Sequence, residues 1–261
     1  MLSFAAIAPH PPIIIPNVGK NNLDLVKKTI AGMNKLEKKL RKNQPDIIII
    51  ISPHGTLFAD AFSINLSEKY TGNFKTFGDL NTNLNFNGDV GLVHRIFEKL
   101  EAKMPVVMLN QPNLDHGTLV PLFYLASHLT NCSIIPIGYS LLDNNKQIEF
   151  GERLKEEILL SNKKIAVIAS GDLSHRLTFD APDGYNPQGK IFDDKLVSLL
   201  KKKLTKQILD LDAELIEGAG QCGLRSILIL LGIIKDINYK PELLSYEGPF
   251  GVGYLVMNFK L

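Results

Sequence analysis

The chain has 261 residues, of which 45% are hydrophobic and 21% charged, and its formal net charge is +2. This length is enough to bury a substantial core, and the balanced composition excludes bulk disorder and a strongly basic nucleic-acid-binding protein. Two cysteines are too few for a disulfide framework, and no apolar run reaches membrane-spanning length. We therefore expect a cytoplasmic protein that binds neither nucleic acid nor a membrane.

The N-terminal third begins with a strand–helix–strand pattern. Residues 2–9 predict a buried strand, and residues 21–44 place apolar side chains at helical spacing with lysines between them. Residues 46–52 contain five consecutive isoleucines, which is typical of a strand covered on both faces. The three segments form a βαβ unit, and we expect its crossover to be right-handed.

The same alternation continues along the rest of the chain. Further strands are expected at 105–109, 133–140, 163–170, 242–248 and 251–259, and helices at 120–129, 146–161 and from about 190 to 236. Residues 56–90 form the most irregular part, and 178–190 is a loop rich in Pro, Gly and Asp. No repeat or composition break divides residues 1–261. The sequence thus predicts one α/β domain with a central, largely parallel or mixed sheet flanked by helices.

Three histidines lie where predicted strands end. His10 follows the first strand, His54 follows the second, and His175 follows the strand at 163–170. Ligands of open α/β sheets bind beyond the carboxyl ends of the strands, so His10 and His54 should emerge at one edge, close together. Imidazole is a common ligand of iron and zinc. We expect a metal site at this edge, although an incidental histidine in a strand-ending turn is the simpler interpretation for either residue alone.

The backbone around both histidines is stiff. Prolines occupy positions 9, 11, 12 and 53, and they fix backbone angles beside His10 and His54. Such restraint reduces the disorder that metal binding would otherwise have to remove. The pair is therefore better explained as ligands than as two unrelated turns.

Two residues are candidates for a third ligand. Glu247, in SYEGPFGVGY, ends another predicted strand in an apolar setting, where a carboxylate is costly to bury unless it meets a cation. Two histidines and a carboxylate form the facial triad of non-haem Fe(II) oxygenases. Cys222, in GQCGLRS, is the alternative, because flanking glycines and Arg225 allow a lowered thiol pKa. Glu247 is the preferred ligand and Cys222 the alternative.

Two further segments supply candidate catalytic residues. In SGDLSH, Asp172 is expected to cap a turn or orient an imidazole, and His175 is a natural general base beside a metal. In LDHGTLVPL, His116 precedes a helix for which Asp115 and Thr118 are capping candidates. An ordinary helix-capping loop explains His116 equally well.

These motifs together resemble those of class III extradiol ring-cleavage dioxygenases, the family of the catalytic B subunit of protocatechuate 4,5-dioxygenase. The resemblance rests on APHPP, SPHG, LDHGTLVPL, SGDLSH and SYEGPFGVGY, in this order and over nearly the whole chain. It implies that His10, His54 and Glu247 hold Fe(II), that His175 is the acid/base, and that His116 lies near substrate and oxygen. The implied substrates are a catecholic or related phenolic compound and O2, with a homodimer or a small partner subunit as further expectations.

Memo-like proteins share this fold and offer a second interpretation. SGDLSH and QCGLRSI resemble their motifs, and in those proteins the cysteine replaces the carboxylate as the metal ligand. Members of the AMMECR1/Memo/radical-SAM system would bind metal without cleaving catechols. Zinc or another divalent metal in place of Fe(II), including a zinc-dependent hydrolase, remains a third alternative.

Overall fold

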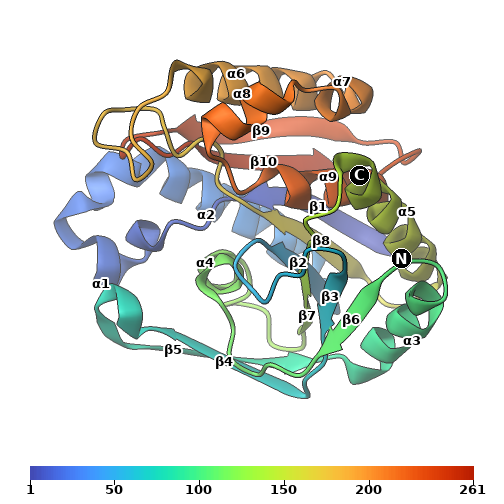
Figure 1. Ribbon diagram of the computed structural model, residues 1–261. Coiled ribbons are helices and arrows are strands. Elements are labelled where there is room, and N and C mark those ends of the chain that lie inside the picture. The colour runs from blue at the N-terminus through green and yellow to red at the C-terminus, as the bar shows by residue number, and fades with distance from the viewer.

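The computed structural model describes all 261 residues and is built around a ten-stranded mixed sheet (Figure 1). The strands are β1 (Leu2–Ala8), β2 (Ile47–Ser52), β3 (Phe62–Asn65), β4 (Lys69–Phe74), β5 (Asp79–Gly88), β6 (Val106–Leu109), β7 (Ser133–Gly138), β8 (Ile165–Ser170), β9 (Lys240–Glu247) and β10 (Tyr254–Lys260). Their order is β4-β5-β7-β2-β8-β1-β10-β9, with β3 pairing to both β6 and β7. The four central strands β7, β2, β8 and β1 run parallel, whereas β10 and β9 close one edge antiparallel.

Helices cover both faces of this sheet. They are α1 (Pro16–Gly19), α2 (Lys27–Asn43), α3 (Val90–Glu101), α4 (His116–Leu125), α5 (Asn144–Leu160), α6 (Pro187–Lys201), α7 (Thr205–Leu209), α8 (Ala213–Ala219) and α9 (Leu224–Ile233), with short 3-10 turns at Pro12–Ile14, Lys20–Val26 and Lys75–Phe77. Figure 1 shows α6, α7 and α8 together beside β9 and β10, and α2 on the opposite side of these strands. The predicted α/β domain is confirmed.

The isoleucines of β2 show how the two layers are built. Ile47, Ile49 and Ile51 point into a core of 42 buried residues shared with α3 and α5 to α9. Ile48 and Ile50 point the other way, into a core of 24 buried residues shared with α2 and α4. Successive strand residues face opposite sides, so a continuous apolar run is what a doubly covered strand requires.

The structure departs from the predicted elements in several places, one of which is α4, which runs over His116–Leu125 and not over the expected 120–129. Residues 56–90, expected to be irregular, contain β3 and the antiparallel hairpin β4–β5. The helix expected from residue 21 begins at Lys27, after a 3-10 turn over Lys20–Val26. The strands β1 and β2 are parallel but not adjacent, because β8 pairs with both and lies between them.

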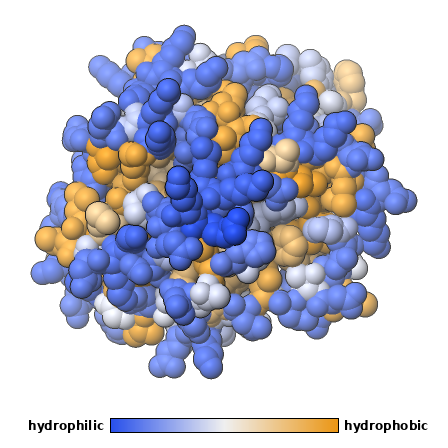
Figure 2. All heavy atoms as spheres, turned by 180° about the vertical axis from the view of Figure 1, so that it is seen from behind, coloured by the Kyte–Doolittle hydropathy of each residue, from blue (hydrophilic) through white to orange (hydrophobic).

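The far face of the molecule is largely hydrophilic, with hydrophobic residues in separate patches (Figure 2). None of the helices combines the length and the apolar character that crossing a lipid bilayer requires.

Candidate metal centre

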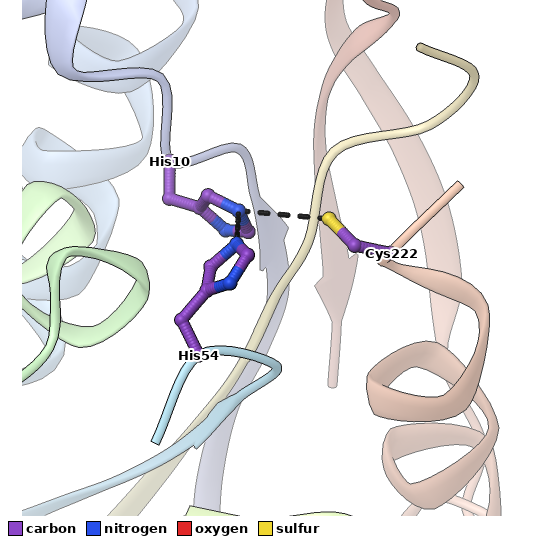
Figure 3. A group of neighbouring side chains, drawn as sticks. All are labelled: His10, His54 and Cys222. Atoms are coloured by element: carbon purple, nitrogen blue, oxygen red, sulfur yellow. Dashed lines mark hydrogen bonds between the residues drawn. The ribbon is translucent and has the colours of Figure 1, made fainter. Parts of the chain in front are cut away.

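His10, His54 and Cys222 form a compact group at the carboxyl ends of the parallel strands. Their potential ligand atoms all lie within 4.8 Å of one another. The Nε2 atom of His10 is 2.9 Å from Nε2 of His54 and 3.6 Å from Sγ of Cys222, so His10 lies between the other two (Figure 3). His10 follows β1 and His54 follows β2, and their side chains meet across the end of the intervening β8.

The hydrogen bonds of Ser170 determine which nitrogen of His10 is free. Ser170, at the end of β8, donates its hydroxyl proton to the carbonyl oxygen of Gly117. Its oxygen therefore accepts from Nδ1–H of His10, at 2.9 Å. A neutral imidazole with its proton on Nδ1 has a lone pair on Nε2, and this is the atom that faces His54 and Cys222. The buried hydroxyl thus holds His10 in the tautomer that a metal ligand needs.

Both histidines of the group are kept neutral. Complete burial is the main reason that the pKa of His10 falls to about 3, with His116 adding to the effect. The pKa of His54 is also lowered, by partial desolvation and then by the neighbouring His10 and His116 rings. His10 is only 2% exposed, whereas His54 reaches solvent. The group is therefore open on the His54 side and closed on the His10 side.

Cys222 supplies the one donor of the group that becomes anionic on binding a metal. Burial, and then the nearby Asp172, raise the pKa of its thiol. A coordinating thiol is nevertheless deprotonated by the metal itself. Two neutral imidazoles and one thiol are a donor set that fits a divalent metal such as zinc or iron, which would replace the hydrogen bond between the two Nε2 atoms. The residues present therefore fit the metal that the sequence implied.

Close packing of two glycines brings the Cys222 turn to the end of β8. A Cβ atom on Gly171 would lie 2.2 Å from Cα of Gly223, so neither position tolerates a side chain without a backbone shift. The Gly223 amide donates to the Asp172 carbonyl oxygen at 2.9 Å, and the Asp172 amide donates to Sγ of Cys222 at 3.3 Å. Cys222 is thereby anchored to the same loop that carries Asp172.

Asp172 positions the backbone of His10. Its Oδ1 accepts from the main-chain N–H of His10 at 2.9 Å, and its Oδ2 is 3.9 Å from Nε2 of the same residue. Burial raises the pKa of this carboxyl group to about 6, although the His10 hydrogen bond acts in the opposite direction. The structure thus connects Asp172 to His10 rather than to His175, the nearest histidine in sequence.

Glu247, the preferred third ligand from sequence, is not brought into this group. Its Oε1 accepts from the main-chain N–H of Thr29 at 2.6 Å and from the Thr29 hydroxyl at 2.7 Å. Thr29 lies in the first turn of α2, whose N-cap residue Val26 makes no side-chain capping bond. Glu247 therefore caps this helix from a distant strand, and Cys222 takes the place beside the two histidines.

His175 lies at the edge of the group with one nitrogen available. Its Nδ1 is 2.6 Å from the carbonyl oxygen of Gly220, a group that only accepts, so Nδ1 carries the proton. The lone pair of a neutral His175 is then on Nε2.

His116 lies against the ring of His54. The two rings stack with centroids 4.2 Å apart and planes 24° from parallel, and the ring of Phe77 makes an edge contact with His116, with centroids 5.4 Å apart. The predicted cap is present: Asp115 is the N-cap of α4, accepting from the amide and hydroxyl of Thr118. His116 therefore restrains the orientation of His54, and burial lowers its own pKa.

One buried carboxylate near the site had no place in the sequence interpretation. Asp193 of α6 is fully buried, accepts from the amide of Ser174 at 2.9 Å and from the hydroxyl of Tyr246 at 2.6 Å. It thereby joins α6 and β9 to the loop that carries His175. An acid at an apolar-face position of a helix, beside Phe192 and Leu196, is the signal that could have identified it.

The comparisons with known proteins agree with this fold. A family model described as the catalytic LigB subunit of aromatic ring-opening dioxygenase matches residues 4–257. Protein JW3007 of Escherichia coli K12, an uncharacterized protein of known crystal structure, superposes with a TM-score of 0.70 at 18% identity, over 98% of this chain and 99% of that one.

Two curated relatives align over most of the chain. A 3,4-dihydroxyphenylacetate 2,3-dioxygenase of Escherichia coli is 24% identical over 94% of each protein. Protein CA_C1420 of Clostridium acetobutylicum is 35% identical over 97% of this chain, which spans only 56% of that relative's length. Because the family model covers nearly every residue, the chain belongs to the LigB family of aromatic ring-opening dioxygenase catalytic subunits.

Proposed function

We propose that this protein is a non-haem Fe(II)-dependent, extradiol-type dioxygenase that acts on a catecholic or related phenolic substrate. The observation that carries this proposal is the group of His10, His54 and Cys222, which offers three metal-donor atoms within 4.8 Å beside a histidine with a free nitrogen. Membership of the LigB family supports oxygenase chemistry at such a centre. The cytoplasm is the proposed location.

Fe(II) held by Nε2 of His10, Nε2 of His54 and Sγ of Cys222 would supply a template and Lewis acid at which a diol and O2 are brought together. The protein's own contribution is to hold these three donors in place before binding. Ser170 fixes the tautomer of His10, Asp172 fixes its backbone, and His116 restrains the ring of His54. Preorganisation of this kind lowers the cost of ordering the site when metal and substrate bind.

His175 is the proposed acid/base of the reaction. With its proton held on Nδ1 by the Gly220 carbonyl oxygen, Nε2 can accept a phenolic proton from the substrate and return it to the ring-opened product. Overall, both atoms of O2 enter the product and one ring C–C bond beside the diol is broken, so no external reductant is needed.

The test uses protein loaded anaerobically with Fe(II) and a panel of catechols. Oxygen uptake and the yellow colour of ring-opened products are expected for some of them. His175→Asn retains a donor at the Nδ1 position toward Gly220 but lacks the basic Nε2, so we expect unchanged iron content and a fall in kcat of about 10²–10⁴. His94→Ala, on the exposed surface of α3, is the control. Iron-loaded protein that cleaves no catechol would overturn the proposal.

A specific observation favours one second candidate. The third donor beside the histidines is a thiol, and this ligand set is the one that the resemblance to Memo-like proteins implied. Thiolate ligands favour zinc and other soft metals. A Memo-like metal-binding protein without catechol cleavage would retain zinc preferentially over Fe(II) and would consume no oxygen with any catechol, whereas a dioxygenase would require iron for turnover.

A further inference from the structure

The side chains of His10, His54 and Cys222 make up the candidate metal group. A polar pocket opens beside His54, on the exposed side of this metal group. It has a volume of about 340 Å³ and lies between the carboxyl end of β7, strand β3, the end of β6 and the first turn of α4. His54 lines both this pocket and the metal group, so the pocket extends from the metal centre toward solvent. A volume of this size accommodates a substituent on a small aromatic ring.

The lining of this pocket is unusual in being polar but almost uncharged. Only three of its fifteen lining residues are hydrophobic, and none is a lysine or an arginine. The one charged residue is Asp115, whose carboxylate already accepts from the hydroxyls of Ser52 and Thr118 and from the Thr118 amide. The pocket's own side chains therefore offer hydrogen bonds and a negative charge; the one cation nearby would be the metal on His54, which the substrate's diol would occupy.

Its hydrogen-bonding groups are held in fixed positions by their neighbours. The backbone of Gln111 is held at both its amide and its carbonyl oxygen by the side chain of Asn65, at 2.9 and 2.7 Å. The side-chain amide of Gln111 donates to the hydroxyl of Thr56 at 2.8 Å. The side chain of Asn113 is exposed and has no hydrogen-bond partner in the protein, so its donor and acceptor are open to solvent and to a ligand.

We propose that this pocket selects a substrate bearing an uncharged hydrogen-bonding substituent, such as a hydroxyl or a carboxamide, and rejects substrates bearing a carboxylate. The inference rests on the proposed function, because the substrate's diol would lie at the metal group while the substituent enters the pocket. A hydroxyl or carboxamide substituent of the substrate would replace its hydrogen bonds to water with hydrogen bonds to Asn113 and Gln111. A carboxylate would lose its hydration beside Asp115 without gaining a cation, which is unfavourable.

This specificity would differ from that of the curated relative. The name of the Escherichia coli enzyme indicates a substrate, 3,4-dihydroxyphenylacetate, that carries a carboxylate. Replacing this carboxylate by a hydroxymethyl group gives 4-(2-hydroxyethyl)catechol, which has the same chain length and no charge. The two compounds have the same chain length and differ in the charge of the substituent, so comparing their affinities measures the effect of that charge.

The first experiment measures anaerobic binding of both compounds to zinc-loaded and Fe(II)-loaded protein by calorimetry, followed by turnover with the iron form. We expect the alcohol to bind at least about tenfold more tightly, since a site built for hydrogen bonding discriminates strongly between polar groups. Equal or tighter binding of the acid, with ring cleavage intact, would overturn the specificity but not the proposed function. Binding of neither compound would overturn the specificity, and the catechol panel alone would then decide the proposed function.

The second experiment adds the missing cation. Asn113→Lys places a positive charge in the pocket at an exposed loop position, and it should raise the affinity for the acid by about tenfold while metal content stays unchanged. Asn162→Lys is the matched control, because Asn162 is exposed in the turn before β8, at the opposite edge of the sheet. If both variants have the same effect on the acid's affinity, the pocket does not hold the substituent and the proposal is wrong.

Discussion

The turn before α9 and the end of β9 each offer one candidate for the third ligand, and they differ in what surrounds them. Cys222 in the turn is held against the backbone of Asp172 and faces His10. Glu247, at the end of β9, accepts hydrogen bonds from Thr29 in the first turn of α2, and the preceding Tyr246 donates a hydrogen bond to Asp193. The turn therefore contributes to the candidate metal group with the two histidines, whereas the end of β9 holds α2, α6 and the His175 loop in place.

The sharpest test of this difference is removal of the thiol. Cys222→Ala leaves two neutral imidazoles and no anionic donor, so we expect metal affinity to fall by more than about 100-fold, beyond the range typical of losing an outer hydrogen bond. Metal content after dialysis and competition with a chelator measure the effect. Cys132→Ala, at the other free cysteine, is the matched control and should retain the metal. If Cys222→Ala retained the metal, the turn before α9 would not supply the third ligand.

The structural role of the end of β9 can be tested through the pH dependence of the free energy of unfolding, because Tyr246 is hydrogen-bonded to the buried Asp193. Burial raises the pKa of Asp193 from 3.8 to about 6. Between these pH values the folded protein holds a proton that the unfolded chain has released, so this group makes the free energy of unfolding fall as pH rises from about 4 to about 6. Asn at position 193 still accepts from Ser174 and can donate to Tyr246, but it does not ionise.

We therefore expect Asp193→Asn to gain stability relative to the unmodified protein as pH rises through this window, by up to roughly 3 kcal/mol. Urea unfolding at several pH values from 4 to 7 measures the difference. Asp194→Asn is the control, since Asp194 is 61% exposed in an ion pair with Lys190. A difference between Asp193→Asn and the unmodified chain that stays constant with pH would contradict the assignment.

The fold was predictable where local pattern and tertiary environment agree. The isoleucines of β2 and the apolar run of β8 predicted buried strands, which the structure contains. The hairpin β4–β5 was not predicted, because asparagines, which are disfavoured in strands, conceal the alternation of Leu84 and Phe86 with polar residues. The position of β8 between β1 and β2 depends on pairing between distant segments, which local pattern does not contain.

The sequence predicted which two histidines lie together, but not which side chain lies beside them. The proximity of His10 and His54 followed from their places at the ends of parallel strands. The sequence did not show that Glu247 has another partner: the free amides of a helix N-terminus satisfy a half-buried carboxylate as well as a cation does, and Thr29 provides such an amide. Cys222 reaches the site through the contact of Gly171 with Gly223, two glycines that lie 52 positions apart in the sequence.

The smallest expected effect belongs to Glu247 itself. Glu247→Ala removes the cap of α2, and we expect the free energy of unfolding to fall by about 1 kcal/mol, while metal affinity stays unchanged. Thermal unfolding and metal titration together measure both quantities. Lys240→Ala at the start of the same strand is the control, because the Lys240 side chain is exposed and its removal should change neither quantity. Should Glu247→Ala lose metal as completely as Cys222→Ala, the carboxylate would have to leave α2 and join the histidines on binding, and the two segments would share one role.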